Sequence, residues 1–153
     1  MTVREAWRGY PLRRYSCDVL VIGGGLAGLM AAREAARSGA RVIVAAKGFA
    51  GADGASVFAG GVVLYLLPGD DWEAFFAEHE QHCEGLAHPE VVRAVASANS
   101  ELWTELAEQG APVARDADGR PERRWVPIGS RVHVPRLRIE SVGLMRFLRQ
   151  QVL

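Results

Sequence analysis

The sequence predicts an α/β fold in which a parallel sheet is followed by added helices. An apolar run at Val19–Ile22 leads into closely spaced glycines, and the next segment, Leu26–Arg37, is rich in helix-favouring alanine and arginine. Gly39 stands where a helix typically ends, and residues 41–45 form a second apolar run. Strand, helix and strand at this spacing predict a right-handed βαβ unit with parallel strands. A continuous apolar strand is typical of a parallel sheet buried on both faces.

The composition excludes several classes of protein. The chain has 153 residues, with 18 basic and 18 acidic side chains and no long basic run, so a nucleic-acid partner is not indicated. Only Cys17 and Cys83 are present, which favours a reducing compartment over a disulfide framework. No apolar run reaches the length of a membrane span. Residues 1–16 lack the apolar core of a signal peptide, so we interpret them as a loose leader and expect a cytoplasmic protein.

A glycine-rich segment, residues 48–61, follows the second strand. It is too poor in bulky side chains to build a core of its own, and its bare backbone is suited to lie against a flat group. Residues 62–67 are apolar and predict a short strand or a buried extended segment. Asp70 or Asp71 is suited to cap a helix reaching about Gln81. One face of that helix carries Trp72, Phe75, Phe76 and His79.

A longer helix is predicted from His88 and Pro89 to Gln109, where Gly110 ends it. Its apolar side comprises Val91, Val95, Leu102 and Leu106, widened by Val92 and Trp103. Residues 116–119 are a turn signal between two short strands. The proline-interrupted stretch 125–138 receives no assignment. Residues 142–153 predict a final helix whose apolar face carries Leu144, Phe147, Leu148 and Val152.

The glycines after the first strand carry the clearest functional signal. Gly23, Gly25 and Gly28 fit G-x-G-x-x-G between a strand and a helix inside a βαβ unit, the context in which this motif is specific. The first glycine allows a sharp turn, the second lets a pyrophosphate approach the backbone, and the third lets helix and sheet pack closely. The helix N-terminus adds unpaired N–H groups and a positive dipole end. The motif therefore predicts dinucleotide binding.

The end of the second strand departs from the NAD pattern. Where an acidic residue usually holds the ribose hydroxyls, the chain has Ala46 and then Lys47. A lysine here is suited to meet a phosphate or the carbonyl-rich edge of a ring, and a solvated lysine at a strand end is an equal alternative. An NAD(P)-binding domain is therefore the weaker hypothesis.

Three segments, residues 16–29, 42–48 and 54–61, together with the spacing from Lys47 to the glycine pair 60–61, carry a family resemblance. They resemble the N-terminal FAD-binding region of the fumarate reductase/succinate dehydrogenase flavoprotein and L-aspartate oxidase family. Later segments are similar to the same family more loosely: the helix from Asp71, residues 88–93 and 101–103, residues 109–115 and the Asp118-Gly119 turn. The resemblance covers nearly the whole chain.

The resemblance implies a Rossmann-like FAD/NAD(P)-binding domain, incomplete here, with helices inserted after the second strand. It implies that the first glycine loop holds the FAD pyrophosphate, and that the lysine and the second loop line the ribityl chain and the isoalloxazine ring. Carried over to this sequence, the cofactor-binding residues are Gly23, Gly24, Gly25, Leu26, Ala27, Gly28, Ala46, Lys47, Gly48, Gly54, Ala55, Ser56, Ala59, Gly60 and Gly61.

Three departures bear on the subgroup. Some relatives attach FAD through a histidine in the second loop, but the matching position is Gly54, so we expect FAD to bind non-covalently. Ala59 stands where glutamine or glutamate often precedes the double glycine. Glu140 and Ser141 stand where the family has threonine and glycine at a helix start.

Relatives in this family are several times longer than this chain. Their capping domain and their catalytic arginine and histidines fall beyond Leu153, so we assign no catalytic residue here. We expect residues 17–153 to be a partial FAD-binding domain, either a fragment or a split chain completed by a partner subunit. The implied reaction is hydride transfer between flavin and a small dicarboxylate of the fumarate/succinate or L-aspartate type, for which this chain alone is inactive. The alternative is a non-catalytic dinucleotide-binding or interaction module that needs a partner.

Other polar groups give weaker signals. His79, His82 and Cys83 lie among glutamates, but no second ligand pair at zinc spacing is present, so we predict a polar helix face and no metal site. His133 is interpreted as structural or exposed rather than as facing a substrate. A C-terminal group of arginines is suited to attract a dicarboxylate or a flavin phosphate, with a solvated surface as the simpler interpretation; it comprises Arg123, Arg124, Arg131, Arg136 and Arg138.

Overall fold

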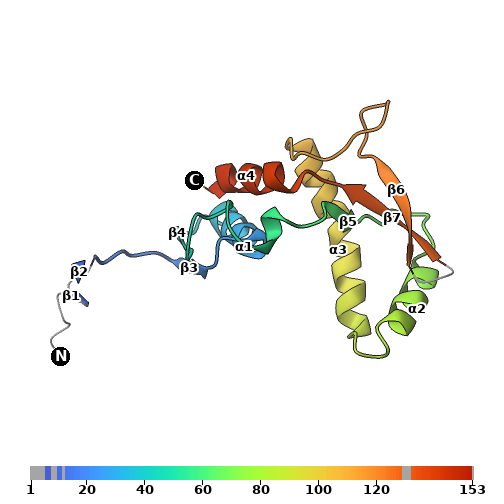
Figure 1. Ribbon diagram of the computed structural model, residues 1–153, viewed down its shortest axis with the longest axis horizontal. Helices are drawn as coiled ribbons and strands as arrows, with labels where there is room; N and C mark the ends of the chain where they lie inside the picture. The colour runs from blue at the N-terminus through green and yellow to red at the C-terminus, as the bar shows by residue number, and fades with distance from the viewer. Residues whose placement is uncertain (1–5, 8–9, 12, 129–131, 153) are drawn as a thin grey trace.

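The computed structural model describes residues 6–7, 10–11, 13–128 and 132–152 (Figure 1). Their elements in chain order are β1 (Ala6–Trp7), β2 (Tyr10–Pro11), β3 (Val19–Ile22), α1 (Leu26–Arg37), β4 (Val42–Ala45), the 3₁₀ turn η1 (Ala55–Val57), β5 (Val62–Leu64), α2 (Trp72–His82), α3 (Pro89–Glu108), β6 (Arg123–Ile128), β7 (Val132–Arg138) and α4 (Ser141–Val152). Within residues 1–16, the described strands β1 and β2 pair antiparallel, away from the body of the chain (Figure 1). Arg131 lies outside the described residues.

The predicted βαβ unit is confirmed. β3 and β4 pair in parallel from Val19 opposite Val42 to Ile22 opposite Ala45, and α1 connects them. At the start of the pair, the Arg41 side chain donates two hydrogen bonds to the carboxylate of Asp18, at 3.0 and 3.1 Å. These hydrogen bonds hold the pKa of Asp18 below its usual value.

The prediction that the first strand is buried on both faces is wrong. Leu20 is 55% exposed and Ile22 is 77% exposed. The parallel sheet has only two strands among the described residues, and α1 packs on one side of it. Alternate side chains of β3 therefore face outward without a covering layer.

The larger antiparallel sheet combines β5, which confirms the short strand predicted within residues 62–67, with β6 and β7, which lie mostly in the stretch left unassigned. It is antiparallel with strand order β5-β7-β6, so the last strand in the sequence is the central one. Pro135 lies in that central strand, where proline is unusual because it lacks an N–H donor. Its carbonyl still accepts a hydrogen bond from the N–H of Tyr65 at 3.0 Å. Prolines at strand positions explain why the sequence pattern gave no strand assignment here.

Helices α2 and α3 begin and end close to their predicted positions. The Asp71 carboxylate accepts a hydrogen bond from the N–H of Ala74 at 2.9 Å and caps α2. The predicted apolar side of α3 is partly wrong, because Val91 and Val95 are 58% and 59% exposed. Leu106 and Trp103 are buried as predicted, and the other buried side chains of α3 are Ala96, Ser100 and Ala107.

The turn at residues 116–119 is confirmed, with the Gly119 N–H donating to the Asp116 carbonyl at 3.0 Å. Of the two predicted flanking strands, only β6 forms; residues before the turn make isolated bridges, such as Arg115 with Pro121. In α4, Leu144 and Leu148 are buried as predicted, together with Met145, which the sequence pattern did not include.

The core consists of two clusters. The larger joins α1, α3, β7 and α4 through buried side chains that include Leu29, Trp103, Leu137 and Leu148. The smaller, formed by Leu66, Phe75 and Ala96, lies between α2, α3 and the segment after β5. Neither cluster contains a residue of β3 or β4. Among the described residues, no helix is long and apolar enough to span a membrane.

Candidate functional site

The turn between β3 and α1 has the geometry that its glycines predict. Gly23 has φ of +110°, a conformation that other residues rarely adopt, and its N–H donates to the carbonyl of Ala45 at 2.8 Å. A Cβ on Gly28 would collide with the carbonyl oxygen of Gly23. The first main-chain hydrogen bond of α1 runs from the N–H of Leu29 to the carbonyl of Gly25 at 2.9 Å. The turn and the helix start are therefore packed backbone against backbone.

The second glycine-rich loop lies directly against the first. The Gly51 N–H donates to the Gly24 carbonyl at 2.8 Å, and a Cβ on Gly24 would lie 2.6 Å from the Cα of Ala50. The Ser56 hydroxyl accepts a hydrogen bond from the N–H of Leu26 at 3.1 Å. The two loops thus touch through backbone, and Ser56 satisfies one of the free donors at the start of α1.

Helix α4, far along the sequence, braces this second loop. The carbonyl oxygen of Met145 would lie 3.0 Å from a Cβ on Gly51, and Gly51 has φ of +77°, so this position favours glycine. The Arg149 guanidinium lies 4.2 Å from the ring centroid of Phe49, a cation–π contact. The loop is therefore held from one side by α1 and from the other by α4.

Between the two loops is an open cavity of about 510 Å³. Six of its residues are glycines or small residues at which a ligand can approach the backbone closely. The complete lining is Gly23, Gly24, Gly25, Ala46, Lys47, Gly48, Phe49, Asp53 and Gly54. The cavity lies beside the N-terminus of α1, whose first turn carries no acidic residue.

The charges of the cavity come from Lys47 and Asp53. Lys47 is exposed and forms no ion pair within the described part of the chain. The Asp53 carboxylate accepts a hydrogen bond from the N–H of Phe49 at 2.5 Å and lies against Gly48, where a Cβ would collide with it. Its position is therefore fixed by the backbone of its own loop. Lys47 is the only lysine or arginine among the described residues that line the cavity.

The structure gathers seven of the predicted cofactor-binding residues around this cavity: Gly23, Gly24, Gly25, Ala46, Lys47, Gly48 and Gly54. Leu26, Ala27 and Gly28 lie in the first turn of α1, while Ala55 and Ser56 form the 3₁₀ turn η1. Ala59 and Gly61 lie further along, where their carbonyls accept hydrogen bonds from the Ser141 hydroxyl at 2.9 Å and the Ile139 N–H at 2.7 Å. Gly60 lies between them in the chain.

Sequence reasoning did not single out Phe49 and Asp53. Asp53 is the only charged residue of the glycine-rich segment 48–61, which was a signal that it has a local role. Phe49 gave no such signal, because its position depends on Arg149 of α4, which is far along the chain.

The cavity fits a dinucleotide cofactor. Gly23 and Gly54 both have positive φ, and a Cβ on either would meet no protein atom within 4 Å, so the backbone there faces open space. Three consecutive glycines, a helix N-terminus without acidic residues and one lysine together provide what a pyrophosphate requires.

The histidines and Cys83 form no metal site within the described part of the chain. Among the described residues, no group of three or more His, Cys, Asp or Glu side chains is placed to hold a metal ion. The Cys83 Sγ lies 3.6 Å from the His79 Nδ1 on one face of α2. His133 lies in β7, and its side chain is outside the described part of the structure.

Comparison with known proteins agrees with this geometry. The family described as "FAD binding domain" matches residues 18–139. L-aspartate oxidase of Mycobacterium tuberculosis is 33% identical over 112 residues, which is 72% of this chain and 21% of that protein. L-aspartate oxidase of Vibrio cholerae is 34% identical over 107 residues, which is 69% of this chain and 20% of that protein.

Solved structures show the same relationship. The Mycobacterium smegmatis Sdh1 complex in its apo form matches with a TM-score of 0.76 and 27% identity, covering 92% of this chain and 24% of that one. FrdA of the E. coli quinol fumarate reductase matches in fold, with a TM-score of 0.74 at 22% identity over 90% of this chain and 24% of that one. The chain thus spans about a fifth to a quarter of the length of these relatives. It belongs to the FAD-binding domain family. It is similar in sequence to the L-aspartate oxidases and to Sdh1, and it shares its fold with FrdA.

Proposed function

We propose that this chain is the FAD-binding portion of a flavin-dependent oxidoreductase that acts on a small dicarboxylate. The observation that carries the proposal is the cavity between the two glycine loops, which are hydrogen-bonded to each other through Gly24 and Gly51. Such an arrangement offers bare backbone from both sides to one flat, phosphate-bearing ligand.

Each part of the cavity has its own proposed role. The N–H groups of Gly24 and Gly25, with those of the first turn of α1 other than the Leu26 N–H that Ser56 occupies, bind the pyrophosphate, since they are pre-oriented donors at a positive helix end. Lys47 adds a positive charge beside the ligand, and the second loop, from Gly48 to Gly61, lines the ribityl chain and the ring. Asp53 is suited to hold that loop in shape, because its carboxylate binds the Phe49 N–H.

When bound, FAD supplies the redox chemistry, which is hydride transfer to or from a small dicarboxylate of the fumarate/succinate or L-aspartate type. To this reaction, the domain of residues 17–153 contributes the binding and the orientation of the cofactor. We assign no catalytic residue to this chain, which covers about a fifth to a quarter of its relatives. We therefore propose that it needs further polypeptide for turnover, in a cytoplasmic setting.

We propose further that FAD binds without a covalent bond. Gly54, at the loop position where some relatives attach flavin, has no side chain to form one. Acid precipitation of the FAD-loaded protein should leave the yellow colour in the supernatant. Colour that stays in the pellet would contradict this assignment of Gly54.

The experiment that tests the main proposal is an absorbance spectrum of the purified chain after FAD is added and excess is removed by gel filtration. We expect retained flavin bands, and we expect Gly60→Ala to weaken FAD binding about tenfold. A Cβ on Gly60 would meet no protein atom within 4 Å, and the backbone there can accept alanine without changing. A loss of FAD binding in this variant would therefore reflect contact between the new methyl group and the ligand. Ala52→Ser, an exposed change in the same loop, is the matched control and should bind FAD normally.

One observation favours a second candidate, a dinucleotide-binding or interaction module without activity. Leu20 and Ile22 leave an apolar strand face uncovered, as expected of a unit completed by another polypeptide. This alternative predicts weak or absent flavin in the isolated chain and folding that improves with a partner. Flavin retained at unit stoichiometry through gel filtration would argue against it.

A further inference from the structure

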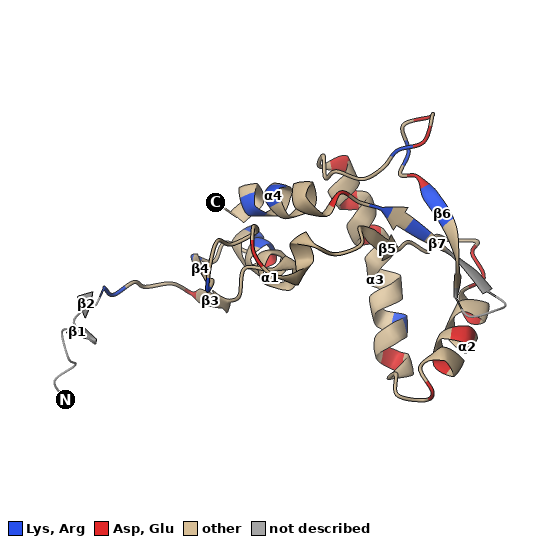
Figure 2. Cartoon of the chain, in the orientation of Figure 1, with Lys and Arg blue, Asp and Glu red and all other residues tan. Residues whose placement is uncertain are grey.

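One face of the antiparallel sheet carries arginines that the cofactor cavity does not use. Side chains alternate along each strand, so Arg124 on β6 shares a face with Arg136 and Arg138 on β7, while Arg123 points to the opposite face. Arg123 is occupied there, because it pairs with the carboxylate of Asp70. Figure 2 shows basic residues gathered on β6 and β7 and acidic residues on α2.

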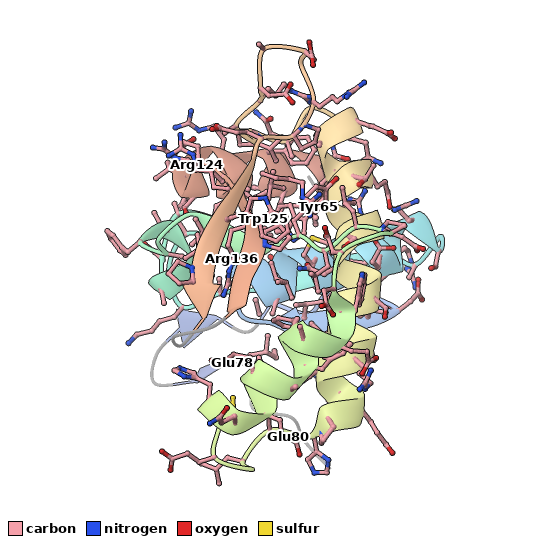
Figure 3. The ribbon with its side chains drawn as sticks, turned by 90° about the vertical axis from the view of Figure 1, so that its right-hand side faces the viewer. Tyr65, Glu78, Glu80, Arg124, Trp125 and Arg136 are labelled. Atoms are coloured by element: carbon pink, nitrogen blue, oxygen red, sulfur yellow. The ribbon has the colours of Figure 1, made fainter. Side chains whose placement is uncertain are left out.

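The arginines of this face are arranged unfavourably for the isolated sheet. Arg124 lies directly opposite Arg136 in the strand register, and like charges in directly opposed positions destabilise a sheet. Figure 3 labels both residues on their neighbouring strands. Glu122 lies 3.0 Å from Arg124, but among the described side chains no carboxylate lies within ion-pair distance of Arg136 or Arg138. The face therefore has more positive charge than the described residues neutralise.

The position of these arginines connects them to the cofactor loop. Arg138 lies opposite Val62, the residue after Gly61, and the N–H of the next residue, Ile139, donates to the Gly61 carbonyl at 2.7 Å. The row of arginines thus begins where the second glycine loop ends. Arg136, the next residue on the same face, is half-buried and lines a cavity of about 380 Å³ between β5, α1 and α3.

That cavity has mainly apolar walls, among them Leu26 and Trp103, and Arg136 is the only charged residue among its described lining residues. A cation at the edge of an apolar cavity suits a carboxylate attached to a short hydrocarbon, because the carboxylate can pair with the cation while the hydrocarbon contacts the apolar walls. Exposed Arg124 and Arg138 on the same face supply charge for a second carboxylate.

We propose that Arg136, with Arg124 and Arg138, forms a binding subsite for a small dicarboxylate beside the end of the second glycine loop. This subsite rests on the proposed function, because its arginines would attract and orient the acidic substrate of that function. An acidic polypeptide segment is the competing ligand, and the half-buried position of Arg136 favours the small molecule.

The test uses the full chain with FAD added and titrates it with succinate, following the Nε–Hε signals of the arginines by NMR. We expect saturable shifts of the Arg136 and Arg124 signals. Arg136→Gln should weaken succinate binding by about tenfold or more, since charge-assisted hydrogen bonds are lost. Arg124→Gln, at an exposed position, gives a second variant with little risk of misfolding. Arg120→Gln and Arg146→Gln make the same charge change elsewhere and should alter binding less than about twofold.

Three results would overturn the subsite: equal weakening in all four variants, butyrate binding as tightly as succinate, or a glutamate-rich peptide binding at least tenfold more tightly than succinate. The FAD retained in each sample is measured by absorbance. Loss of FAD with intact succinate shifts would count against the proposed function alone. Retained FAD with no succinate shift would overturn the subsite and leave the cofactor proposal standing.

Discussion

The βαβ unit and the antiparallel sheet unit contrast in how they are encoded and stabilised. The βαβ unit (β3, α1 and β4) has the strongest sequence motif, yet its strands contribute no residue to either core cluster, and Ile22 is 77% exposed. The antiparallel unit (β5 to β7 with α2 and α3) has no clear sequence motif, yet its Leu137 is fully buried and its strands and helices contribute residues to both core clusters.

The contrast shows that most of the residues expected to bind the cofactor and most of the residues that stabilise the fold lie in different parts of this chain. The glycine loops depend on short-range spacing and on close approach of the backbone, and a small number of residues is enough to specify both. The core needs many apolar side chains brought together from distant segments. Helix α4 joins the two, because it packs on α1 and adds Leu144, Met145 and Leu148 to the larger cluster.

The largest expected effect comes from breaking the βαβ unit at its closest contact. Gly28→Ala should lower the free energy of unfolding by about 3 kcal/mol and abolish FAD retention, because the added Cβ collides with the Gly23 carbonyl. Urea unfolding followed by circular dichroism measures the first effect, and gel filtration with FAD the second. Gly60→Ala, which meets no protein atom, is the control and should leave stability within about 0.5 kcal/mol. A Gly28→Ala protein of wild-type stability would show that the packing of this turn is not tight.

The antiparallel unit is tested at Asp70, whose carboxylate pairs with Arg123 and accepts the Leu67 N–H at 2.6 Å. Burial raises the pKa of Asp70, but the hydrogen bonds from Arg123 and Leu67 and the charge of Arg123 outweigh it, so the pKa lies below its usual value. Because the folded-state pKa is the lower one, this stabilisation is present above the unfolded pKa of about 3.9 and is lost as pH falls through the folded value.

We therefore expect Asp70→Asn to cost about 2 kcal/mol at pH 7, and the difference from wild type to shrink below about pH 4. Urea unfolding at pH 7, 5 and 3.5 measures it. Asp71→Asn is the matched control, since asparagine also caps helices well and should leave stability nearly unchanged. A difference that stays constant with pH would exclude the ionised pair as its origin.

The junction between the two units is tested at Arg33, whose side chain on α1 is only 2% exposed. Its guanidinium binds Glu105 and Gln109 of the α3 end at 2.8 and 2.7 Å, and its Nε has no partner among the described residues. Arg33→Ala should cost about 1.5 kcal/mol, since it removes both packing and the ion pair. Arg33→Met should be within about 0.5 kcal/mol of wild type, because apolar groups of similar volume often replace buried ion pairs without loss.

Arg37→Ala provides the comparison at this junction. Arg37 also pairs with Glu105, at 2.7 Å, but its side chain is 52% exposed, so the loss should be below about 0.5 kcal/mol. If Arg33→Met is as destabilised as Arg33→Ala, the charge rather than the packed volume joins α1 to α3. Chemical denaturation of the three variants in parallel measures their free energies of unfolding and shows whether charge or packed volume joins the two helices.

The smallest effect should be a gain of stability in the antiparallel sheet. Arg124→Thr removes one member of the directly opposed Arg124 and Arg136 pair and adds a β-branched residue, so we expect about 0.5 kcal/mol of stabilisation. Thermal unfolding with and without 0.5 M salt measures it, and salt should narrow the difference by screening the charges. Destabilisation by this variant would indicate that the Glu122 ion pair outweighs the repulsion.

Much of the architecture could be predicted from local pattern. The bounds of β3, α1 and α2, the cap at Asp71 and the parallel pairing all follow from short-range spacing and helix propensity. The antiparallel sheet could not, because Pro127 and Pro135 break the strand pattern while tertiary pairing overrides it. The apolar face of α3 was predicted correctly at Leu106 and Trp103 but wrongly at Val91 and Val95, which match a helical repeat yet are exposed.

The sequence by itself determined the glycine turn, the absence of a side chain at Gly54 and Lys47 after the second strand, because these depend on residue identity and short spacing. Only the tertiary structure decided that the two glycine loops are joined through Gly24 and Gly51, that α4 braces Phe49, and that Arg124 and Arg136 lie opposite each other. These relations join residues that are distant in the chain. No local preference specifies them, and they arise when the apolar side chains of α1, α3, β7 and α4 are buried together.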